Sequence, residues 1–139
     1  MGLSLWFQRR TNVRTTERIR RKGGRMMGMD LLILHTVGRR SGEPRQSPLS
    51  WFADGESSRL IIASGGGKRN PDWYANLMAH PDHAKVELHG EDAVPVTVDR
   101  LEGTERDRAW RLIVEAQPRY ARYQNRSDRR YPVIRLTTS

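Results

Sequence analysis

The sequence predicts an α+β fold, a small β-barrel of about six mostly antiparallel strands with two helices packed on its outside. Short apolar runs of strand length alternate with turn residues such as Asp54-Gly55, a spacing typical of hairpin connections. Two segments, near residues 71–80 and 104–116, carry helix signals instead. The length of 139 residues and the lack of an internal repeat indicate one core domain.

Three strands are expected in the first half of the domain. The apolar run 31–36 predicts a buried strand, and residues 47–53 predict a second strand. Pro48 near the start of the second strand indicates a sheet edge or a bulge, because proline cannot donate to a strand ladder. A third strand is expected over residues 59–64, and the glycine triplet 65–67 then interrupts the chain.

The second half is expected to hold both helices and three more strands. Asn70 is predicted as the N-cap of the first helix, with Pro71 at its first position. Thr104-x-x-Asp107 resembles a capping box that opens the second helix. Residues 117–130 are polar and are expected to be irregular. The ordered elements are expected at residues 71–80 (helix), 84–88 and 94–101 (hairpin), 104–116 (helix) and 131–136 (strand).

The composition excludes several kinds of site. The chain has no cysteine, which excludes disulfides, thiolate nucleophiles, iron–sulfur clusters and cysteine-ligated zinc. No run approaches the roughly 18 consecutive apolar residues of a membrane span, and the first residues do not resemble a secretory signal, so a cytoplasmic location is expected. The four histidines are scattered, and neither a metal site nor a Ser-His-Asp triad is expected.

Basic residues are concentrated at the N-terminus. Eight of the 25 lysines and arginines but only one of the 16 acidic residues lie in residues 1–25, which gives this segment a charge of +7 and the remaining residues +2. We therefore divide the chain into a basic amphipathic arm, residues 1–25, and a domain, residues 26–139. With Leu3, Trp6, Phe7 and Val13 on one face, the arm suits an anionic membrane surface, and a solvated terminus is the alternative.

Residues 38–45, which we call the arginine loop, place three arginines between two predicted strands. Guanidinium groups bind phosphate and carboxylate oxygens through paired hydrogen bonds, and the two glycines allow a ligand to approach the backbone closely. A solvated basic turn is the alternative reading of such a charge run. The combination of arginines, glycines and a serine favours an anion-binding loop.

Two further features are candidates for binding. Residues 64–68 form a glycine-rich loop between a strand and a helix, where free amides attract anions, although the spacing of a Walker loop or a dinucleotide fingerprint is missing. Tyr120 and Tyr123 lie three residues apart, so one helical turn would place them on one face. A plain flexible loop and an ordinary packed tyrosine pair are the alternatives.

Three segments together resemble a known family. They are residues 31–49 (LLILHTVGRRSGEPRQSPL), 61–77 (IIASGGGKRNPDWYANL) and 118–133 (PRYARYQNRSDRRYPV). They are similar to the deazaflavin-dependent nitroreductase family, within the split-barrel flavin and deazaflavin oxidoreductases. The resemblance implies a split β-barrel that binds reduced coenzyme F-420, an obligate hydride carrier, and passes the hydride to a quinone-like or nitroaromatic acceptor.

The resemblance also implies roles for individual residues. Arg39, Arg40 and Arg45 match the loop that holds the coenzyme's phosphate and polyglutamate tail. On the acceptor side, Ser64, Tyr120 and Tyr123 match polar residues that line the acceptor pocket and are the candidate catalytic residues. The remaining candidates for coenzyme binding are Ser41, Ser47, Pro48, Leu49, Ala63, Ser64, Gly65, Gly66, Gly67, Lys68, Pro71, Trp73, Tyr74 and Asn76.

Two departures from the family pattern concern the acceptor side. Position 117 carries Gln where the best-known member has a pocket tyrosine, and the glycine loop is one residue shorter. These differences bear on the acceptor, and on nitro compounds in particular, rather than on the coenzyme.

Three alternatives stay open at this point: an FMN-binding split-barrel oxidoreductase, a non-catalytic F-420 binder, and a basic nucleic-acid-binding module. Three arginines in one loop favour the longer anionic tail of F-420 over FMN. A nucleic-acid partner is not expected, because the domain lacks a recognition helix or an aromatic platform on a sheet. The expected partners are a quinone and, through the arm, a membrane surface, and the chain is expected to be a monomer or a homodimer.

Overall fold

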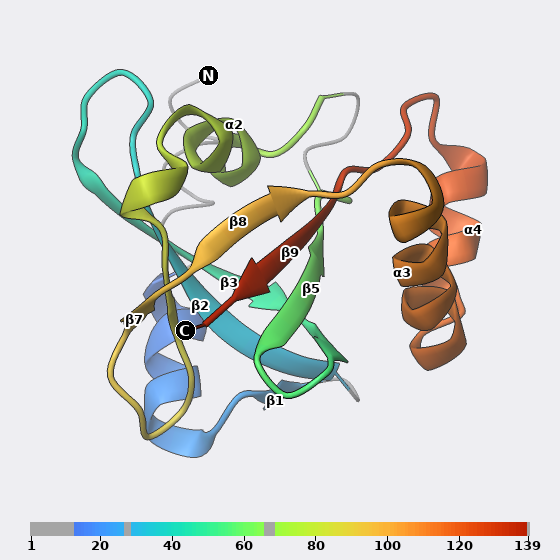
Figure 1. Cartoon of the computed structure of the whole chain (residues 1–139). Helices are drawn as coiled ribbons and strands as arrows, with labels where there is room; N and C mark the ends of the chain where they lie inside the picture. Colours follow the sequence, from blue (N-terminus) through green and yellow to red (C-terminus); the bar gives the residue numbers. More distant parts are fainter. Residues whose placement is uncertain (1–12, 27–28, 66–68, 139) are drawn as a thin grey trace.

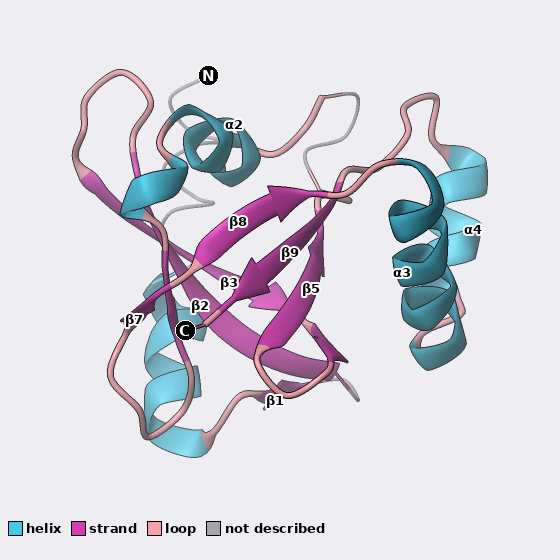
Figure 2. Cartoon of the chain, viewed as in Figure 1, coloured by secondary structure: helices cyan, strands magenta, loops and turns pink. Residues whose placement is uncertain are grey.

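The computed structural model describes residues 13–26, 29–65 and 69–138, the part of the chain to which the structural statements below refer. It confirms an α+β fold, with strands arranged in two antiparallel sheets and helices packed around them (Figures 1 and 2). In the first sheet the strand order is β1-β2-β6-β7, and β3 also pairs with β2. In the second sheet the order is β4-β5-β9-β8.

The strands of the first sheet are β1 (Arg25–Met26), β2 (Met29–Val37), β3 (Pro44–Ser50), β6 (Lys85–Glu87) and β7 (Val94–Pro95). Those of the second sheet are β4 (Phe52–Asp54), β5 (Ser58–Ile62), β8 (Thr97–Arg100) and β9 (Val133–Thr137). The helices cover residues 13–22, α2 (Asp72–Ala79), α3 (Gly103–Ala116) and α4 (Arg119–Arg126), and a short 3-10 turn, η1, covers Pro81–His83.

Alternating residues of the second sheet face two different cores. Ile61 and Ile134 are fully buried in a cluster that they share with β2 and α2. Their neighbours Leu60 and Val133 are fully buried in a second cluster, on the opposite face, which α3 and α4 complete. This alternation follows from the two-residue period of a strand. The second sheet is therefore a middle layer between the first sheet and the helix pair, which lies to the right in Figure 1.

The predicted count of about six strands is wrong, because the short β1 was not predicted and two predicted strands each divide between the sheets. Residues 47–53 were expected as one strand, but the chain leaves the first sheet after β3 and enters the second at β4. Residues 94–101 divide in the same way into β7 and β8 around Val96. Hydrophobic patterning alone cannot mark such a crossing, since the residues on both sides have strand character. Pro48 lies within β3, which pairs with β2 alone, as expected for an edge strand.

The predicted count of two helices is also wrong. Residues 117–130 were expected to be irregular, yet they contain α4, whose Tyr120 is buried while most of its other side chains are polar. The predicted caps differ as well: α3 begins one residue earlier with Glu102 as its N-cap, and α2 is capped by Pro71 rather than Asn70. The side-chain oxygen of Asn70 accepts a hydrogen bond from Arg129 instead.

The described part of the arm forms a helix over residues 13–22, which we call the N-terminal helix, in blue in Figure 1. Ile19 is fully buried and Thr16 is almost so, which shows that one face of this helix packs against the domain. Leu3, Trp6 and Phe7 lie outside the described residues. The division at residue 25 and the closure of the sheets into a split barrel remain predictions. Within the described residues, no helix combines the length and the apolar character that crossing a membrane requires.

Candidate functional site

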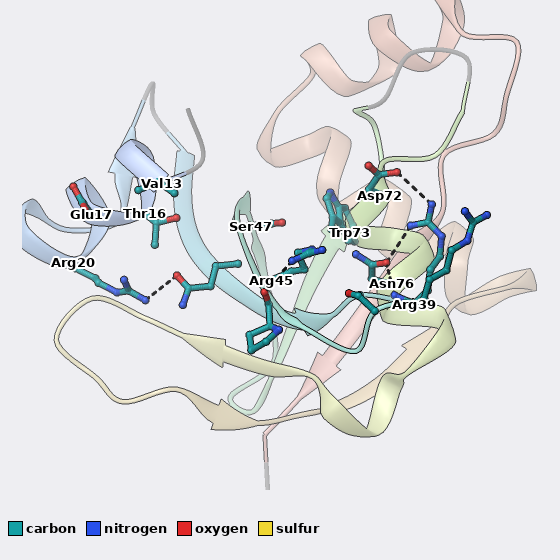
Figure 3. Close-up of a pocket in the computed structure, with 15 residues that line it drawn as sticks. Val13, Thr16, Glu17, Arg20, Arg39, Arg45, Ser47, Asp72, Trp73 and Asn76 are labelled. Carbon is teal, nitrogen blue, oxygen red and sulfur yellow. Dashed lines mark hydrogen bonds and ion pairs between the residues drawn. The ribbon is translucent and has the colours of Figure 1, made fainter. Parts of the chain in front are cut away.

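A cavity of about 630 Å³ opens between the N-terminal helix, the turn that joins β2 to β3, and α2 (Figure 3). These three segments are far apart in the sequence, and the sheets bring them together. The lining residues are Val13, Thr16, Glu17, Arg20, Gly38, Arg39, Arg40, Ser41, Pro44, Arg45, Gln46, Ser47, Asp72, Trp73 and Asn76.

The arginine loop forms one wall of this cavity as a compact hairpin turn. The backbone N–H of Gly38 donates to the carbonyl of Glu43 at 2.9 Å, and the N–H of Gly42 donates to the carbonyl of Gly38 at 2.8 Å. Gly42 has a φ of 70°, which favours glycine. A side chain at Gly38 would place its Cβ 2.5 Å from the Ser41 hydroxyl, so the Ser41 side chain would have to rotate away. Gly42 thus fits the turn by its backbone conformation, and the close approach of a ligand to the two glycines stays a prediction.

Asn76 of α2 anchors the arginine loop to the domain. Its nearly buried side-chain oxygen accepts hydrogen bonds from the backbone N–H of Arg39 at 3.0 Å and from the Nη1 of the same residue at 3.1 Å. Asp72, one helical turn earlier, lies 3.7 Å from the Arg39 Nη2. A buried amide oxygen needs such partners, because an unsatisfied polar group in the interior costs about 1–3 kcal/mol. Asn76 therefore fixes where the Arg39 guanidinium lies at the cavity.

The opposite wall is the N-terminal helix, which Arg20 attaches to the first sheet. The Nε and Nη2 of Arg20 donate to the two carboxylate oxygens of Glu87 at 2.7 and 3.0 Å, and Nη2 also donates to the side chain of Gln46 at 3.1 Å. The Nε2 of His35 donates to the same carboxylate at 2.9 Å. We call these four residues the Glu87 cluster. The hydrogen bond from Arg20 is the main cause that lowers the pKa of Glu87 to about 2; burial opposes the shift, and the bond from His35 adds to it.

The charge at the cavity is positive. Four guanidinium groups and two carboxylates line it, and one of the four, Arg20, is neutralised by Glu87 just outside the lining. Arg40 forms no hydrogen bond or ion pair with another residue of the described chain, and Arg45 has only the exposed Glu43, at 3.7 Å, as a carboxylate partner. Trp73 adds a flat apolar surface. The arrangement suits a ligand with an anionic portion and a planar apolar portion.

A sequence profile of the F420H(2)-dependent quinone reductase family matches residues 6–138. The chain belongs to this family. A curated F420H(2)-dependent quinone reductase of Mycobacterium tuberculosis strain H37Rv is 33% identical to the chain over 150 residues, which covers 99% of each protein.

Two solved structures support the same assignment. An F420-H2 dependent reductase, FDR-A, is 37% identical, with a TM-score of 0.66, over 76% of this chain and 92% of that chain. A second structure, described as a domain-swapped dimer, is 32% identical, with a TM-score of 0.68, over 96% and 98% of the two chains. Membership in the F420H(2)-dependent quinone reductase family confirms the predicted resemblance and the expected F-420-dependent oxidoreductase class. The comparisons support F-420 as the coenzyme and give no support to FMN.

In this member of the family, the structure brings only part of the predicted coenzyme-binding set to the cavity. Seven predicted residues line it: Arg39, Arg40, Ser41, Arg45, Ser47, Trp73 and the anchoring Asn76. Leu49 and Tyr74 instead pack into the first core cluster, where the ring of Tyr74 lies edge-on to Trp73 at 6.3 Å and supports it from behind. Pro48, Ala63, Ser64, Gly65 and Pro71 are also outside the lining, and Gly66, Gly67 and Lys68 lie outside the described residues.

The glycine loop is held by a residue that the sequence analysis missed. The Nη1 of Arg129 donates to the carbonyl of Ala63 and to the side chain of Asn70, both at 2.8 Å. Its Nη2 donates to the carbonyls of Ser64, at 3.2 Å, and Gly65. One guanidinium thus connects both ends of the loop. Arg129 lies in the third of the segments that carry the resemblance, but nothing in the local sequence indicates a contact 64 to 66 residues away.

The structure places the tyrosine pair away from the described cavity. The rings of Tyr120 and Tyr123 meet edge-on at 5.7 Å, so α4 does bring them to one side, as their spacing predicts. Tyr120 is buried, it packs edge-on against Phe52 at 5.8 Å, and its hydroxyl donates to the sulfur of Met29 at 3.7 Å. Burial raises the pKa of Tyr120. Tyr123 is 43% exposed. Neither tyrosine lines the cavity, and neither does Ser64, so their catalytic role remains a prediction.

Proposed function

We propose that the chain transfers a hydride from reduced F-420 to a quinone-type acceptor, and that the cavity between the arginine loop and the N-terminal helix holds the coenzyme. The observation that carries this proposal is the convergence of Arg39, Arg40 and Arg45 on one cavity, with Asn76 fixing the first of them. Family membership supplies the reaction class, since the relatives are F420H(2)-dependent quinone reductases.

The residues at the cavity fit an anionic coenzyme with a planar ring. Arg40, which is exposed, and Arg45, which is partly exposed, would hold the anionic tail, because neither is neutralised by a buried carboxylate. Trp73 and Ser47 would border the ring system. When bound, the coenzyme supplies the hydride, so the protein's tasks are to bind, orient and shield it. This division of labour agrees with a site that needs neither a metal cluster nor a nucleophile.

On the acceptor side we propose Tyr120, Tyr123 and Ser64. Hydroxyl groups in a shielded pocket stabilise the negative charge that develops on an acceptor oxygen as the hydride arrives. The sulfur of Met29 is a weak acceptor, so the Tyr120 hydroxyl can exchange that contact for a quinone oxygen at small cost. The apolar surroundings of this pair, including Phe52, suit a hydrophobic acceptor.

Assembly and location are parts of the same proposal. A relative of known structure is a domain-swapped dimer, which supports a homodimer for this chain. A cytoplasmic enzyme whose arm touches a quinone-containing membrane follows from the charge of residues 1–25. The split-barrel closure of the two sheets is proposed on the same family resemblance.

The proposal is tested by mixing the full chain, loaded with reduced F-420, with a soluble quinone under anaerobic conditions. We expect the oxidised coenzyme to appear with saturable dependence on the quinone and with one quinone reduced per coenzyme oxidised. An Arg45→Ala variant should need more coenzyme to reach the same rate. A chain that binds reduced F-420 but never oxidises it with any quinone would instead be a non-catalytic binder.

A further inference from the structure

The N-terminal helix belongs to the cavity as well as to the arm. Val13, Thr16, Glu17 and Arg20 recur at intervals of three or four residues, so they form one face of the helix, and all four line the cavity across from α2 (Figure 3). The same helix buries Ile19 completely against the domain. A segment that the charge pattern presents as a detachable basic arm is thus also one side of the proposed coenzyme site.

Glu87 is the residue that holds this helix in place from the sheet. Its carboxylate accepts two hydrogen bonds from Arg20, while His35 on the neighbouring strand β2 donates to it from the other side. The side chain of Glu87 is only 14% exposed, so its bonds are protected from water more than those of an ordinary surface ion pair. Two-point binding of a guanidinium also fixes its orientation, which a lysine in its place could not do.

A second contact fixes the C-terminal end of the helix. The carbonyl of Ile19 accepts a hydrogen bond from the Nδ1 of His89 at 2.9 Å and another from the backbone N–H of Gly23 at 3.1 Å. The helix is therefore held at its last turn by Arg20 and Ile19, whereas Val13 at its other end is 57% exposed. The last turn of the helix is thus attached to the domain at two points, Glu87 and His89.

We propose that the N-terminal helix is a wall of the coenzyme site and that Glu87, through Arg20, is the positioning residue that keeps this wall closed. The inference rests on the proposed function, in which this cavity holds F-420. It differs from the division of the chain into an arm and a coenzyme-binding domain: loss of the Glu87–Arg20 bonds should release the helix and weaken coenzyme binding. In turn, a bound coenzyme should hold the helix on the domain.

The test compares Glu87→Gln with Asp54→Asn in the full chain. Asp54 is the matched control, because it is another largely buried carboxylate bound by two basic residues, Arg108 and Arg135, that do not line the cavity. Two readouts are measured for each variant: the Kd for F-420 by fluorescence titration, and the rate at which trypsin cuts within residues 14–22, which hold five basic residues. The cuts are located by mass spectrometry, with and without F-420.

For Glu87→Gln we expect a Kd about tenfold higher, the effect of losing one charge-assisted interaction, and several-fold faster cleavage within residues 14–22. F-420 should slow this cleavage in the wild-type chain. Asp54→Asn should leave both readouts at wild-type values even if its melting temperature falls. If Glu87→Gln does not fold, Arg20→Gln releases the same contact from the helix side, where the side chain is 41% exposed, and should raise the Kd and speed cleavage after the four basic residues that remain within residues 14–22.

An unchanged Kd in Glu87→Gln would overturn the proposal, whether or not cleavage becomes faster, because the helix would then lie outside the coenzyme site. Equal effects of Glu87→Gln and Asp54→Asn would also overturn it, since both would then report general destabilisation. Failure of the proposed function has a different signature: the wild-type chain would not bind F-420 at all, while the cleavage comparison would still report how the helix is attached.

Discussion

Two largely buried carboxylates of this protein are each bound by two basic residues and serve different parts of the molecule. Glu87 is bound by Arg20 and His35 next to the cavity, as described above. Asp54 accepts hydrogen bonds from Arg108, at 3.2 Å to both oxygens, and from the Nε of Arg135 at 2.9 Å. For Asp54, burial raises the carboxyl pKa, but the bonds from Arg135 and Arg108 outweigh it, so the net pKa is lowered, as it is for Glu87.

The difference lies in what each carboxylate holds. The Asp54 cluster, which we define as Asp54, Arg108 and Arg135, joins α3 to β4 and β9 at a site where none of its members lines the cavity. In the Glu87 cluster, Arg20 and Gln46 both line the cavity. Similar ion pairs therefore support the helix pair in one place and the proposed coenzyme site in the other. The role of each carboxylate therefore depends on whether the residues bound to it line the cavity, and the lowered pKa alone does not reveal it.

The largest expected effect is on coenzyme binding, and it should be confined to the cavity side. The double variant Arg39→Ala/Arg45→Ala should raise the Kd for F-420 by about a hundredfold or more, because each charge-assisted hydrogen bond contributes about 1.5–3 kcal/mol and 1.4 kcal/mol is a factor of ten. Fluorescence titration measures this change. Arg111→Ala, an exposed arginine of α3 outside the lining, is the control and should bind normally. Equal weakening by the control would show a diffuse charge effect instead of a site.

The next largest effect concerns Arg129, which ties the glycine loop to the domain. Arg129→Ala leaves three backbone carbonyls without this donor, and we expect the free energy of unfolding to fall by about 2–4 kcal/mol. For a domain of this size that corresponds to a melting temperature lower by roughly 10 °C in a calorimetric scan. A variant that melts within about 2 °C of wild type would show that water replaces the guanidinium without cost.

The sequence predicts those parts of the site that depend on neighbouring residues, but not those that depend on contacts between distant segments. The arginine loop was predictable because its glycines and arginines are neighbours in the chain, and a local turn fixes their relation. The central part of β2 and α2 are also predictable, since each has a local pattern of its own. The Arg20–Glu87 contact spans 67 residues and the Arg129–Ala63 contact spans 66, and only the packed sheets bring such residues together.

The missed elements share a physical reason as well. In α4 only Tyr120 is buried, so the helix lacks the apolar stripe that a periodicity argument needs. The chain crosses between sheets at Trp51, with no turn residue, and at Val96, next to Pro95 in a run of strand-forming residues, so the pattern predicts one strand at each place. Local patterns identify elements, but the partners of those elements depend on tertiary packing.

The stability that Glu87 and Asp54 contribute should depend on pH, because each carboxylate loses its charge in acid whereas the amide of a Gln or Asn variant does not. The pKa of Glu87 is depressed from 4.5 to about 2, so its ionised form stabilises the fold above about pH 4.5, and this stabilisation is lost as the pH falls toward about 2. At neutral pH we expect Glu87→Gln to lower the free energy of unfolding by about 1–3 kcal/mol, measured by urea denaturation. The gap should close as the pH approaches 2, because wild-type Glu87 is then protonated. A difference that is constant with pH would contradict ionic bonding at this carboxylate.

The lowered pKa of Asp54 predicts that the difference in free energy of unfolding between Asp54→Asn and the wild type also becomes smaller in acid.

The smallest expected effect lies on the acceptor side, close to the helix pair. Tyr120→Phe and Tyr123→Phe should each slow the oxidation of bound, reduced F-420 by a quinone about tenfold, less than the loss of a donor in a fully closed site. The Kd for F-420 should not change, because neither hydroxyl lines the cavity. Single-turnover measurements on the preformed complex separate these quantities. Unchanged rates in both variants and in the double variant would mean that the tyrosines only pack.

The most direct measurement is a titration of the purified full-length chain with F-420 and, separately, with FMN, at low and at high salt. We predict tighter binding of F-420 than of FMN, weakened by salt because exposed guanidinium groups contact the anionic tail, and weakened further by Arg45→Ala. Binding of FMN that equals or exceeds that of F-420, or F-420 binding that Arg45→Ala leaves unchanged, would contradict the assignment of this cavity to the deazaflavin coenzyme.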